Sequence, residues 1–328
     1  MPRCLLRFWN ERKSTERGED NLNAMATAPP VKFTVVICTW NRASLLLQTL
    51  KQLTRIERPT ASWEIIVVNN NCTDETDSVL DRFAGQLPLR RVFEAEPGVS
   101  NARNTAIRHA AGEYIVWTDD DVLIDSDWLC AYERAVKRWP ETAVFGGPVR
   151  PRFEGTPPSW LADIWQQVGE VFATRELGKE PLELDGADNV PYGPNFVVRR
   201  REQQQFLYDP DLGRKREAGV LGEETAVVEA IIAGGGRGRW VPDAIVEHWI
   251  PKQRQTVKYL RTYYTLLGKT HYLQNRDGTR RLRQHRSGLW CKAVQSEMVY
   301  YLARMSGNPH RWLKPLVEAS ILWGALKK

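Results

Sequence analysis

The most regular pattern in the chain is a series of short apolar runs separated by segments with helical spacing. Residues 31–39 and 63–68 are rich in β-branched side chains, which is typical of strands buried on both faces of a parallel sheet. Between them, leucines recur every three or four positions within residues 43–53, as on one face of a helix. Strand, helix and strand in this short span predict a right-handed βαβ unit.

The same kinds of pattern continue along the chain and predict an α/β domain followed by helices. Further helices are expected at 75–83, 98–111, 128–139 and 222–233, and further strands at 89–93, 114–117, 143–145 and 192–199. A last strand is expected to carry Pro242 and Asp243 and to close the body by residue 248.

Residues 151–188 show no clear period. Their Trp160 and Trp165 fit either a hydrophobic flap packed on the core or a platform for an acceptor. Beyond them, amphipathic helices are predicted at 256–271, 289–304 and 312–326. None of these reaches the roughly 18 to 20 apolar residues that a bilayer span requires, but the last two could lie on a membrane surface.

Composition indicates an ordinary core and a reducing compartment. The chain has 328 residues and 42% hydrophobic content, enough for one large domain or two smaller ones. Its five cysteines are odd in number and include no Cys-x-x-Cys pair, which favours the cytosol. Residues 1–30 mix charges and have no apolar signal-peptide region, so we expect a flexible extension there.

Charge is distributed unevenly. From Lys252 to Lys328 there are 16 Lys and Arg but only 3 Asp and Glu, a net charge of +13. Because the whole chain has a net charge of +6, residues 1–251 have a net charge of −7. This favours a tail that faces phosphates, of a membrane surface or of nucleic acid. A solvated helical face is the simpler alternative.

Three consecutive carboxylates, Asp119 to Asp121, follow the apolar run at 114–117. They repel one another unless a cation neutralises them, and oxygen ligands at this density suit Mg²⁺ or Mn²⁺. An acidic turn that caps the next helix is the plain alternative. Polar residues also follow Ile37, Val68 and Phe93, and open α/β sheets bind ligands at the carboxyl ends of their strands. Together these features predict a nucleotide-diphosphate pocket.

Two common nucleotide folds are not supported. The chain has no Gly-x-x-x-x-Gly-Lys-Ser/Thr motif, and its first strand ends in Thr-Trp-Asn-Arg instead of Gly-x-Gly-x-x-Gly.

Six short motifs occur over residues 33 to about 250. They are Val35-Val-Ile-Cys-Thr-Trp-Asn-Arg42, Ile65-Ile-Val-Val-Asn-Asn-Asn-Cys-Thr-Asp74, Gly98-Val-Ser-Asn-Ala-Arg-Asn104, Thr118-Asp-Asp-Asp121, Gly193-Pro-Asn195 and Gly222-Glu-Glu224. In order and spacing they resemble the motifs of the family 2 glycosyltransferases. The resemblance implies an α/β GT-A fold with a Rossmann-like, mostly parallel sheet, followed here by a C-terminal helical extension. It also implies an inverting sugar transfer from a nucleotide sugar, usually a UDP-sugar, with Mg²⁺ or Mn²⁺.

The resemblance assigns a set of residues to the nucleotide sugar. Asn69 stands where the family usually has a uracil-reading Asp, a departure because an amide presents a different pattern of donors and acceptors. Asn71 is expected near the base or ribose. The whole set is Thr39, Asn41, Arg42, Asn69, Asn71, Arg103, Asp119 and Asp120.

The resemblance also divides the acidic residues by role. Asp119 would face the ribose and Asp121 would hold the metal, whereas Asp120 would point away or support the diphosphate. His248 is the second expected metal ligand, although a lone histidine is often structural.

The family's catalytic base is the second acid of a Glu-Asp pair, which here reads Glu223-Glu224. A carboxylate must remove the acceptor hydroxyl proton, and Glu224 is the expected base with Glu223 as the competitor. Two acids in the first turn of a helix, favoured there by the helix dipole, are the structural alternative.

These inferences predict four regions: a flexible extension at 1–30, a nucleotide-sugar-binding half at 31–125, an acceptor-binding and catalytic-base half at 126–251, and a basic helical tail at 252–328. The expected function is sugar transfer to a saccharide or lipid-linked acceptor in cell-surface polysaccharide or glycolipid synthesis. The expected location is the cytoplasm, peripherally at the inner face of the cytoplasmic membrane. The alternatives are a non-catalytic nucleotide-sugar-binding protein and a nucleic-acid-binding protein that uses the tail.

Overall fold

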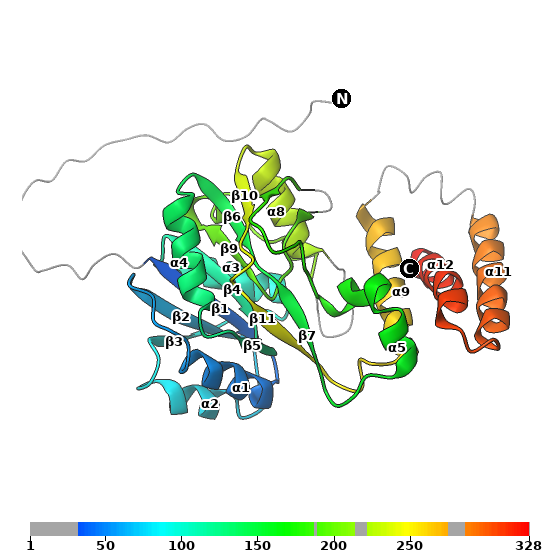
Figure 1. The fold of residues 1–328 in the computed structure, drawn as a ribbon, viewed down its shortest axis with the longest axis horizontal. Helices are drawn as coiled ribbons and strands as arrows, with labels where there is room; N and C mark the ends of the chain where they lie inside the picture. Colours follow the sequence, from blue (N-terminus) through cyan, green and yellow to red (C-terminus); the bar gives the residue numbers. More distant parts are fainter. Residues whose placement is uncertain (1–31, 187–188, 214–221, 275–285, 328) are drawn as a thin grey trace, which may run out of the picture. The chain divides into compact units, whose positions relative to one another are not determined.

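Eight strands form one sheet in the order β3-β2-β1-β4-β9-β6-β10-β8 (Figure 1). β1, β2, β3 and β4 run parallel, so their carboxyl ends meet at one edge. β9 runs antiparallel between β4 and β6 and thereby joins the first half of the chain to the second. The strands are β1 (Phe33–Thr39), β2 (Trp63–Asn69), β3 (Leu89–Phe93), β4 (Tyr114–Asp119), β6 (Thr142–Gly146), β8 (Glu183–Leu184), β9 (Phe196–Arg199) and β10 (Arg237–Trp240).

Helices cover both faces of this sheet. Along β1, Val35 and Ile37 belong to a core cluster with α1, α2 and α4, whereas Val36 packs in a second cluster with α3 and α8. Because neighbouring strand residues point to opposite faces, burial on both sides explains the unbroken apolar runs and confirms the predicted α/β class. The helices are α1 (Ala43–Leu53), α2 (Thr76–Phe83), α3 (Val99–His109), α4 (Trp128–Arg138), α7 (Arg200–Gln203) and α8 (Glu223–Ala233).

The computed structural model describes residues 32–186, 189–213, 222–274 and 286–327. The predicted extension at 1–30 lies outside these residues. The predicted boundary near residue 125 falls between β5 and α4, and the central sheet continues on both sides of it.

A second, three-stranded sheet joins β5 (Val122–Ile124), β11 (Val246–Ile250) and β7 (Val149–Phe153) in the order β5-β11-β7. The single strand expected around Pro242 and Asp243 is wrong, because these two residues form a turn between β10 and β11. Proline lacks the N–H that a sheet ladder requires, which favours the turn. In the resulting register, His248 lies opposite Val122 and therefore next to the acidic turn.

Residues 151–188 contain more regular structure than predicted. The end of β7 is followed by α5 (Ser159–Asp163), α6 (Trp165–Val168), the 3₁₀ helix η1 (Gly169–Phe172) and β8. Trp160 packs on Trp312 with ring centroids 5.6 Å apart, and Trp165 packs edge-on against Phe153 at 4.9 Å. These contacts favour the hydrophobic-flap interpretation of both tryptophans, and the segment's short helices explain why no long period was visible.

The three predicted C-terminal helices are present as α9 (Val257–Gln274), α11 (Arg286–Arg304) and α12 (Pro309–Leu326). α9 and α12 approach so closely that a Cβ on Gly268 would lie 2.1 Å from the Ile321 carbonyl oxygen, and one on Gly324 would lie 2.0 Å from that of Thr265. Only glycine permits this backbone contact. None of the helices within the described residues combines the length and apolar character needed to cross a bilayer.

Asn195 is fully buried and uses every hydrogen-bonding position of its amide. Its Oδ1 accepts from the Trp128 indole N–H and the Tyr132 hydroxyl, both at 2.8 Å. Its Nδ2 donates to the carbonyl oxygens of Pro148 and Ala244 at 2.9 and 2.6 Å. One side chain therefore ties α4, the turn before β7 and the connection before β11 to the sheet.

Replacing this amide should be costly. Asn195→Leu is expected to lower the free energy of unfolding by about 3–5 kcal/mol, because two buried donors and two buried carbonyls lose their partner. Tyr132→Phe removes one donor from the same group and should cost only about 1 kcal/mol. Urea unfolding followed by circular dichroism measures both, and equal losses would contradict the linking role.

Candidate active site

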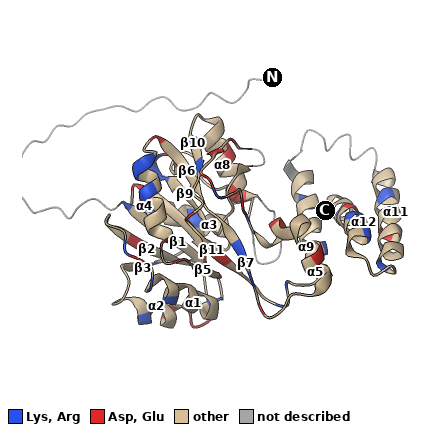
Figure 2. Cartoon of the chain, in the orientation of Figure 1, with Lys and Arg blue, Asp and Glu red and all other residues tan. Residues whose placement is uncertain are grey.

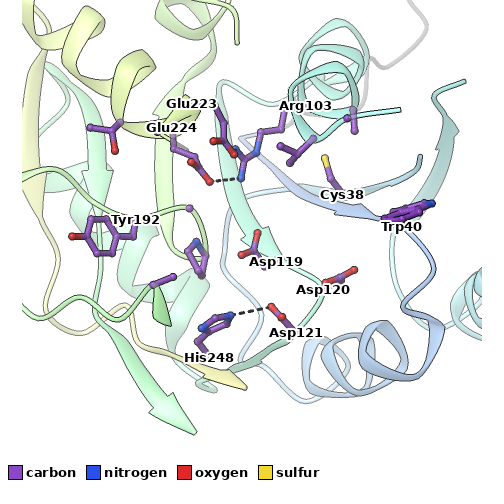
Figure 3. A pocket seen from close by; sticks show the side chains of 18 of the residues that line it. Cys38, Trp40, Arg103, Asp119, Asp120, Asp121, Tyr192, Glu223, Glu224 and His248 are labelled. Atoms are coloured by element: carbon purple, nitrogen blue, oxygen red, sulfur yellow. Dashed lines mark hydrogen bonds and ion pairs between the residues drawn. The ribbon is translucent and has the colours of Figure 1, made fainter. Parts of the chain in front are cut away.

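A cavity of about 930 Å³ opens at the carboxyl ends of β1 and β4 (Figure 3). This is the edge that open α/β sheets use for ligands, and the volume is at the upper end of the roughly 300–1,000 Å³ typical of ligand pockets. Its walls come from the end of β1, the start of α3, the acidic turn after β4, the start of α8, β11 and one face of α9.

Asp120 is anchored within this site. Its carboxylate accepts a hydrogen bond from the Thr39 hydroxyl at 2.7 Å and another from Arg42 Nη1 at 2.8 Å. Burial raises the pKa of Asp120 to about 6, and the Arg42 charge limits the rise. Asp120 therefore does not point away from the site, one of the two orientations expected for it, but connects the ends of β1 and β4.

Asp121 is buried and faces three cationic or ionisable groups. Arg42 Nη1 approaches its Oδ2 at 3.1 Å, Arg254 approaches the same oxygen at 3.5 Å, and His248 Nε2 lies 3.3 Å from Oδ1. Burial alone would raise the pKa of Asp121, but these neighbours, His248 foremost, hold that pKa below its usual range. The Trp249 N–H donates to the Asp121 carbonyl at 2.9 Å, so β11 also fixes the backbone of the turn.

The tautomer of His248 follows from its other ring nitrogen. Nδ1 lies 2.6 Å from the Phe172 carbonyl oxygen, and because a carbonyl can only accept, Nδ1 must carry the proton. In a neutral ring the Nε2 lone pair then faces the Oδ1 lone pairs of Asp121. Either a proton or a metal cation between these atoms would relieve the repulsion between the lone pairs. Asp121 Oδ1 has no hydrogen-bond partner among the described residues.

Asp119 completes a set of possible metal ligands. One ligand atom each from Asp119, Asp121 and His248 lies within 4.8 Å of the others. Burial, followed by the charge of Asp121, raises the pKa of Asp119, and Arg103 opposes the rise. Two carboxylates and an imidazole in this arrangement could hold a divalent cation such as Mn²⁺ or Mg²⁺.

The two glutamates at the start of α8 share one buried arginine. Arg103 donates to Glu224 at 2.7 Å and to Glu223 at 3.1 Å, and it also packs over the ring of Tyr208. The Glu224 side chain is 21% exposed and that of Glu223 only 7%, so Glu224 has more access to the cavity. Burial would raise the pKa of Glu224, but the ion pair with Arg103 outweighs burial and lowers it. Glu224 is therefore ionised at neutral pH, as a general base must be.

The cavity brings together ten of the twelve predicted site residues. Asn69 and Asn71 are the exceptions, because the described residues that line the cavity include Asn70 in their place. Asn69 Oδ1 accepts from the Cys72 N–H at 2.7 Å and Nδ2 donates to Asp77 at 3.0 Å, so its amide stabilises the turn after β2. Asn71 takes a left-handed backbone conformation in that turn, with φ of 61°. The ten that line it are Thr39, Asn41, Arg42, Arg103, Asp119, Asp120, Asp121, Glu223, Glu224 and His248.

Several residues that line the cavity were not predicted as site residues. Trp40 lies at the cavity wall and is 42% exposed. The sequence feature that could have identified it is a large aromatic residue directly after a buried strand. Asn70 donates to the carbonyls of Glu94 and Glu96 and accepts from the Gly98 N–H, which shapes the entry to α3.

The wall opposite the acidic turn was also missed. It includes Glu170 and Tyr192, together with one face of α9: Tyr263, Leu267, Thr270 and His271. The charges of Glu170 and Tyr192 add to burial in raising the pKa of Tyr263, which indicates that these side chains lie close together. The spacing along α9 was visible as an amphipathic pattern, but it did not reveal which surface the face would cover.

Comparison with known proteins identifies the family. Residues 34–202, just over half of the chain, match the sequence profile of Glycosyl transferase family 2. The chain belongs to this family. It is therefore a glycosyltransferase, and the predicted resemblance is confirmed.

Two characterised relatives show how far the likeness extends. The succinoglycan biosynthesis protein ExoM of Rhizobium meliloti (strain 1021) is 24% identical over 241 residues, which cover 72% of each protein. The poly(ribitol-phosphate) beta-N-acetylglucosaminyltransferase TarS of Staphylococcus aureus (strain Mu50 / ATCC 700699) is 28% identical over 102 residues, 30% of this chain and 18% of TarS.

Solved structures of similar shape confirm the GT-A fold. The mannosyltransferase PcManGT from Pyrobaculum calidifontis, solved with GDP-Man and Mn²⁺, aligns with a TM-score of 0.58 at 20% identity over 92% of this chain and 89% of PcManGT. The crystal structure of S. aureus TarS aligns with a TM-score of 0.51 at 15% identity over 71% of this chain and 39% of TarS.

Gly193 tests how tightly Glu224 is held. A Cβ on Gly193 would lie 2.3 Å from Glu224 Oε1, so Gly193→Ala must displace this carboxylate from Arg103. We expect turnover to fall by roughly tenfold to a hundredfold with little change in melting temperature. Gly85→Ala, which meets no atom within 4 Å, is the matched control. Full turnover of Gly193→Ala, followed as nucleotide release from UDP-sugars, would contradict the importance of this geometry.

Proposed function

We propose that this protein is an inverting, metal-dependent glycosyltransferase that moves a sugar from a nucleoside diphosphate sugar to a saccharide or lipid-linked acceptor in cell-surface polysaccharide or glycolipid synthesis. The observation that carries the proposal is the convergence of two acidic groups on one cavity. Asp119, Asp121 and His248 form one, and Glu224, held by Arg103, lies across from them (Figure 3).

The donor would bind along the ends of β1 and β4. Trp40 offers a flat, exposed aromatic surface on which a nucleobase can stack, a contact that every base permits. Thr39 and Arg42 orient the acidic turn through Asp120, and the Arg42 guanidinium, which lines the cavity, could also donate to phosphate oxygens. Uridine is the proposed base, from the family resemblance. PcManGT was solved with a GDP-sugar, so guanosine is the alternative to test.

The residues present fit a divalent cation. Asp121 Oδ1 is buried without a hydrogen-bond partner among the described residues, and the Phe172 carbonyl keeps the His248 Nε2 lone pair directed toward it. Asp121 and His248, with Asp119 beside them, would hold Mn²⁺ or Mg²⁺. When bound, the cation would offset negative charge on the departing diphosphate.

Glu224 is the proposed catalytic base. It would take the proton of the acceptor hydroxyl while that oxygen forms a bond to the anomeric carbon and the bond from this carbon to the diphosphate breaks. A single displacement of this kind inverts the anomeric centre. Arg103 would keep the Glu224 carboxylate ionised and oriented, and Glu223 would fix Arg103 from its buried side.

The acceptor would enter between α8 and α9. Tyr192, Tyr263 and Leu267 provide apolar and aromatic surface there, and Glu170 and Glu229 provide carboxylates, a combination that suits the hydroxyl groups and apolar faces of a sugar. α9 belongs to the basic tail, so the tail would serve the acceptor as well as the location of the enzyme. We propose that the enzyme acts peripherally at the inner face of the cytoplasmic membrane.

Nucleotide binding should depend on the metal. UDP is expected to raise the melting temperature in the presence of Mn²⁺ and not in its absence, because Asp119, Asp121 and His248 would hold the cation and its charge would offset that of the diphosphate. Asp121→Asn and His248→Gln should each remove most of this shift. Asp127→Asn, in a separate acidic group near Glu57 and Cys130, should leave it intact.

The same thermal-shift screen distinguishes the alternatives. A larger rise in melting temperature with GDP than with UDP would indicate guanosine as the base of the donor and would leave the rest of the proposal unchanged. The absence of a shift with any nucleoside diphosphate, with or without Mn²⁺, would contradict the proposed donor class.

The two glutamates should differ in kinetics. Glu224→Gln is expected to lower kcat by roughly a hundredfold to ten-thousandfold while the UDP-induced thermal shift persists, because an amide cannot accept the proton. Glu223→Gln should have the smaller effect, through Arg103. Release of nucleotide from labelled UDP-sugars measures both. Normal turnover in both variants would exclude a catalytic base at this pair, and metal-dependent nucleotide binding without turnover in the unmodified protein would favour a non-catalytic binding protein.

A further inference from the structure

Helix α11 exposes a row of large apolar side chains. On its inner side, Ala293 and Tyr300 are buried, and α11 packs along α12 (Figure 1). Its opposite side, here called the outer face of α11, consists of Trp290 (54% exposed), Met298 (63%), Val299 (46%), Tyr301 (60%) and Leu302 (70%), and it is extended by Met305 (85%), the first residue after the helix.

The outer face is continuous. Counted from Trp290, its other members within the helix follow after 8, 9, 11 and 12 residues, and at 3.6 residues per turn these positions fall within about 180° of the helix circumference. Helices normally turn a stripe of this kind toward the core, so its exposure marks a contact surface for something outside the described chain.

α12 offers no such face, although both helices were candidates for a membrane surface from the sequence. Trp312, Leu313 and Leu316 of α12 are buried in a core cluster with α5, α9 and Tyr300 of α11. Of the two helices, only α11 has large apolar side chains that are exposed.

Charge around the outer face indicates its partner. Glu297 is the one acidic residue of α11, and it is already paired with Arg261 of α9 at 2.8 Å. The other exposed charged residues of the two helices are mostly basic. They are Lys292 on α11, Arg304, which packs over Trp312, and Arg311 and Lys314 on α12, against the single carboxylate of Glu318 on α12. Figure 2 shows blue segments on both helices. Apolar side chains bordered by cations, with no free carboxylate on the helix, match an anionic lipid surface.

We propose that the outer face of α11 docks on the surface of an anionic lipid bilayer, with its apolar side chains in the interfacial region and the flanking cations on lipid phosphates. A second copy of the chain fits less well, because a symmetric contact would bring two tails of balance +13 together. Nucleic acid would attract the cations but would not bury Met298, Leu302 and Met305.

Docking would connect the membrane to the cavity through packed helices. α11 packs on α12, and α12 meets α9 at the close contact of Gly268 and Gly324. The face of α9 that lines the cavity therefore belongs to the same packed unit as the docking face. This link to a lipid-linked acceptor rests on the proposed function, whereas docking itself does not.

Vesicle flotation tests the docking face without donor or acceptor. The full chain should float with phosphatidylcholine vesicles that contain about 30% phosphatidylglycerol and not with pure phosphatidylcholine, and raising the salt from about 0.1 M to about 0.5 M should weaken binding. Met298→Asp combined with Leu302→Asp should lower the partition constant for vesicle binding at least about tenfold, since two carboxylates would enter the membrane interface.

The matched control is Phe93→Asp combined with Leu207→Asp. These two residues are exposed apolar side chains of the body, so the control carries the same charge change and should bind vesicles normally. All four positions are exposed, and thermal melting verifies that both variants fold. Equal binding by the two double variants, or no flotation of the unmodified chain, would overturn the proposal.

Two further measurements separate the competing explanations. Light scattering after size exclusion would overturn the lipid assignment in favour of a second copy if the unmodified chain is a dimer that the Met298/Leu302 variant splits. Nucleotide release from UDP-sugars without vesicles should be unchanged in that variant. Loss of flotation with intact release in this variant supports docking and leaves the transferase proposal standing. Flotation of the unmodified chain without any nucleotide release would instead leave docking standing and contradict the transferase proposal.

Discussion

The constraint that organises this structure is the self-repulsion of three neighbouring carboxylates at the end of β4. Asp120 and Asp121 are buried, and Asp119 is partly so, yet like charges in a low-dielectric environment require positive partners. Each partner comes from a different part of the chain: Arg42 from the end of β1, Arg103 from α3, His248 from β11 and Arg254 from the segment before α9. The fold must bring these four segments to one edge.

Much of the remaining architecture supplies that convergence. The parallel pairing of β1 with β4 places Thr39 and Arg42 beside the acidic turn. The second sheet sets His248 opposite Val122, one residue beyond Asp121, and the Asn195 amide ties the connection before β11 to α4 and the main sheet. Asn195 lies outside the cavity lining, but its hydrogen bonds hold in place the strand that carries the histidine.

The parts of the fold that could be predicted are those whose signal is local. Apolar runs buried on both faces identified β1, β2 and β4, and helical spacing identified α1, α8 and the three C-terminal helices. The second sheet was missed because β5 has three residues and β11 pairs with partners about 100 residues away in the sequence. The turn at Pro242 and Asp243 shows the same limit. The proline was visible in the sequence, but the passage of the chain there from β10 in one sheet to β11 in the other was not.

For the site, residue type was easier to predict than orientation. The acidic turn, Glu223, Glu224 and His248 could be named because the sequence around them resembles motifs of the family, and all of them line the cavity. The side-chain direction at the end of β2 could not be predicted, because a shift of one residue decides that Asn70 and not Asn69 faces the cavity. Which glutamate is more accessible from the cavity could not be predicted either, because it depends on how the two share Arg103, which lies 120 and 121 positions away in the sequence.

The basic tail shows how charge and packing answer different questions. Its balance of +13 predicted an affinity for phosphates but assigned it to no surface, and both of its last helices contain similar apolar residues. Packing separates them, because α12 buries Trp312 and Leu316 between its neighbours whereas α11 leaves Met298 and Leu302 exposed. Because α9 and α12 pack closely, the position of α9, which lines the cavity, depends on its contact with α12. A substitution that separates Gly268 from Ile321 would therefore disturb the part of the cavity wall that α9 provides, even though neither residue lines the cavity.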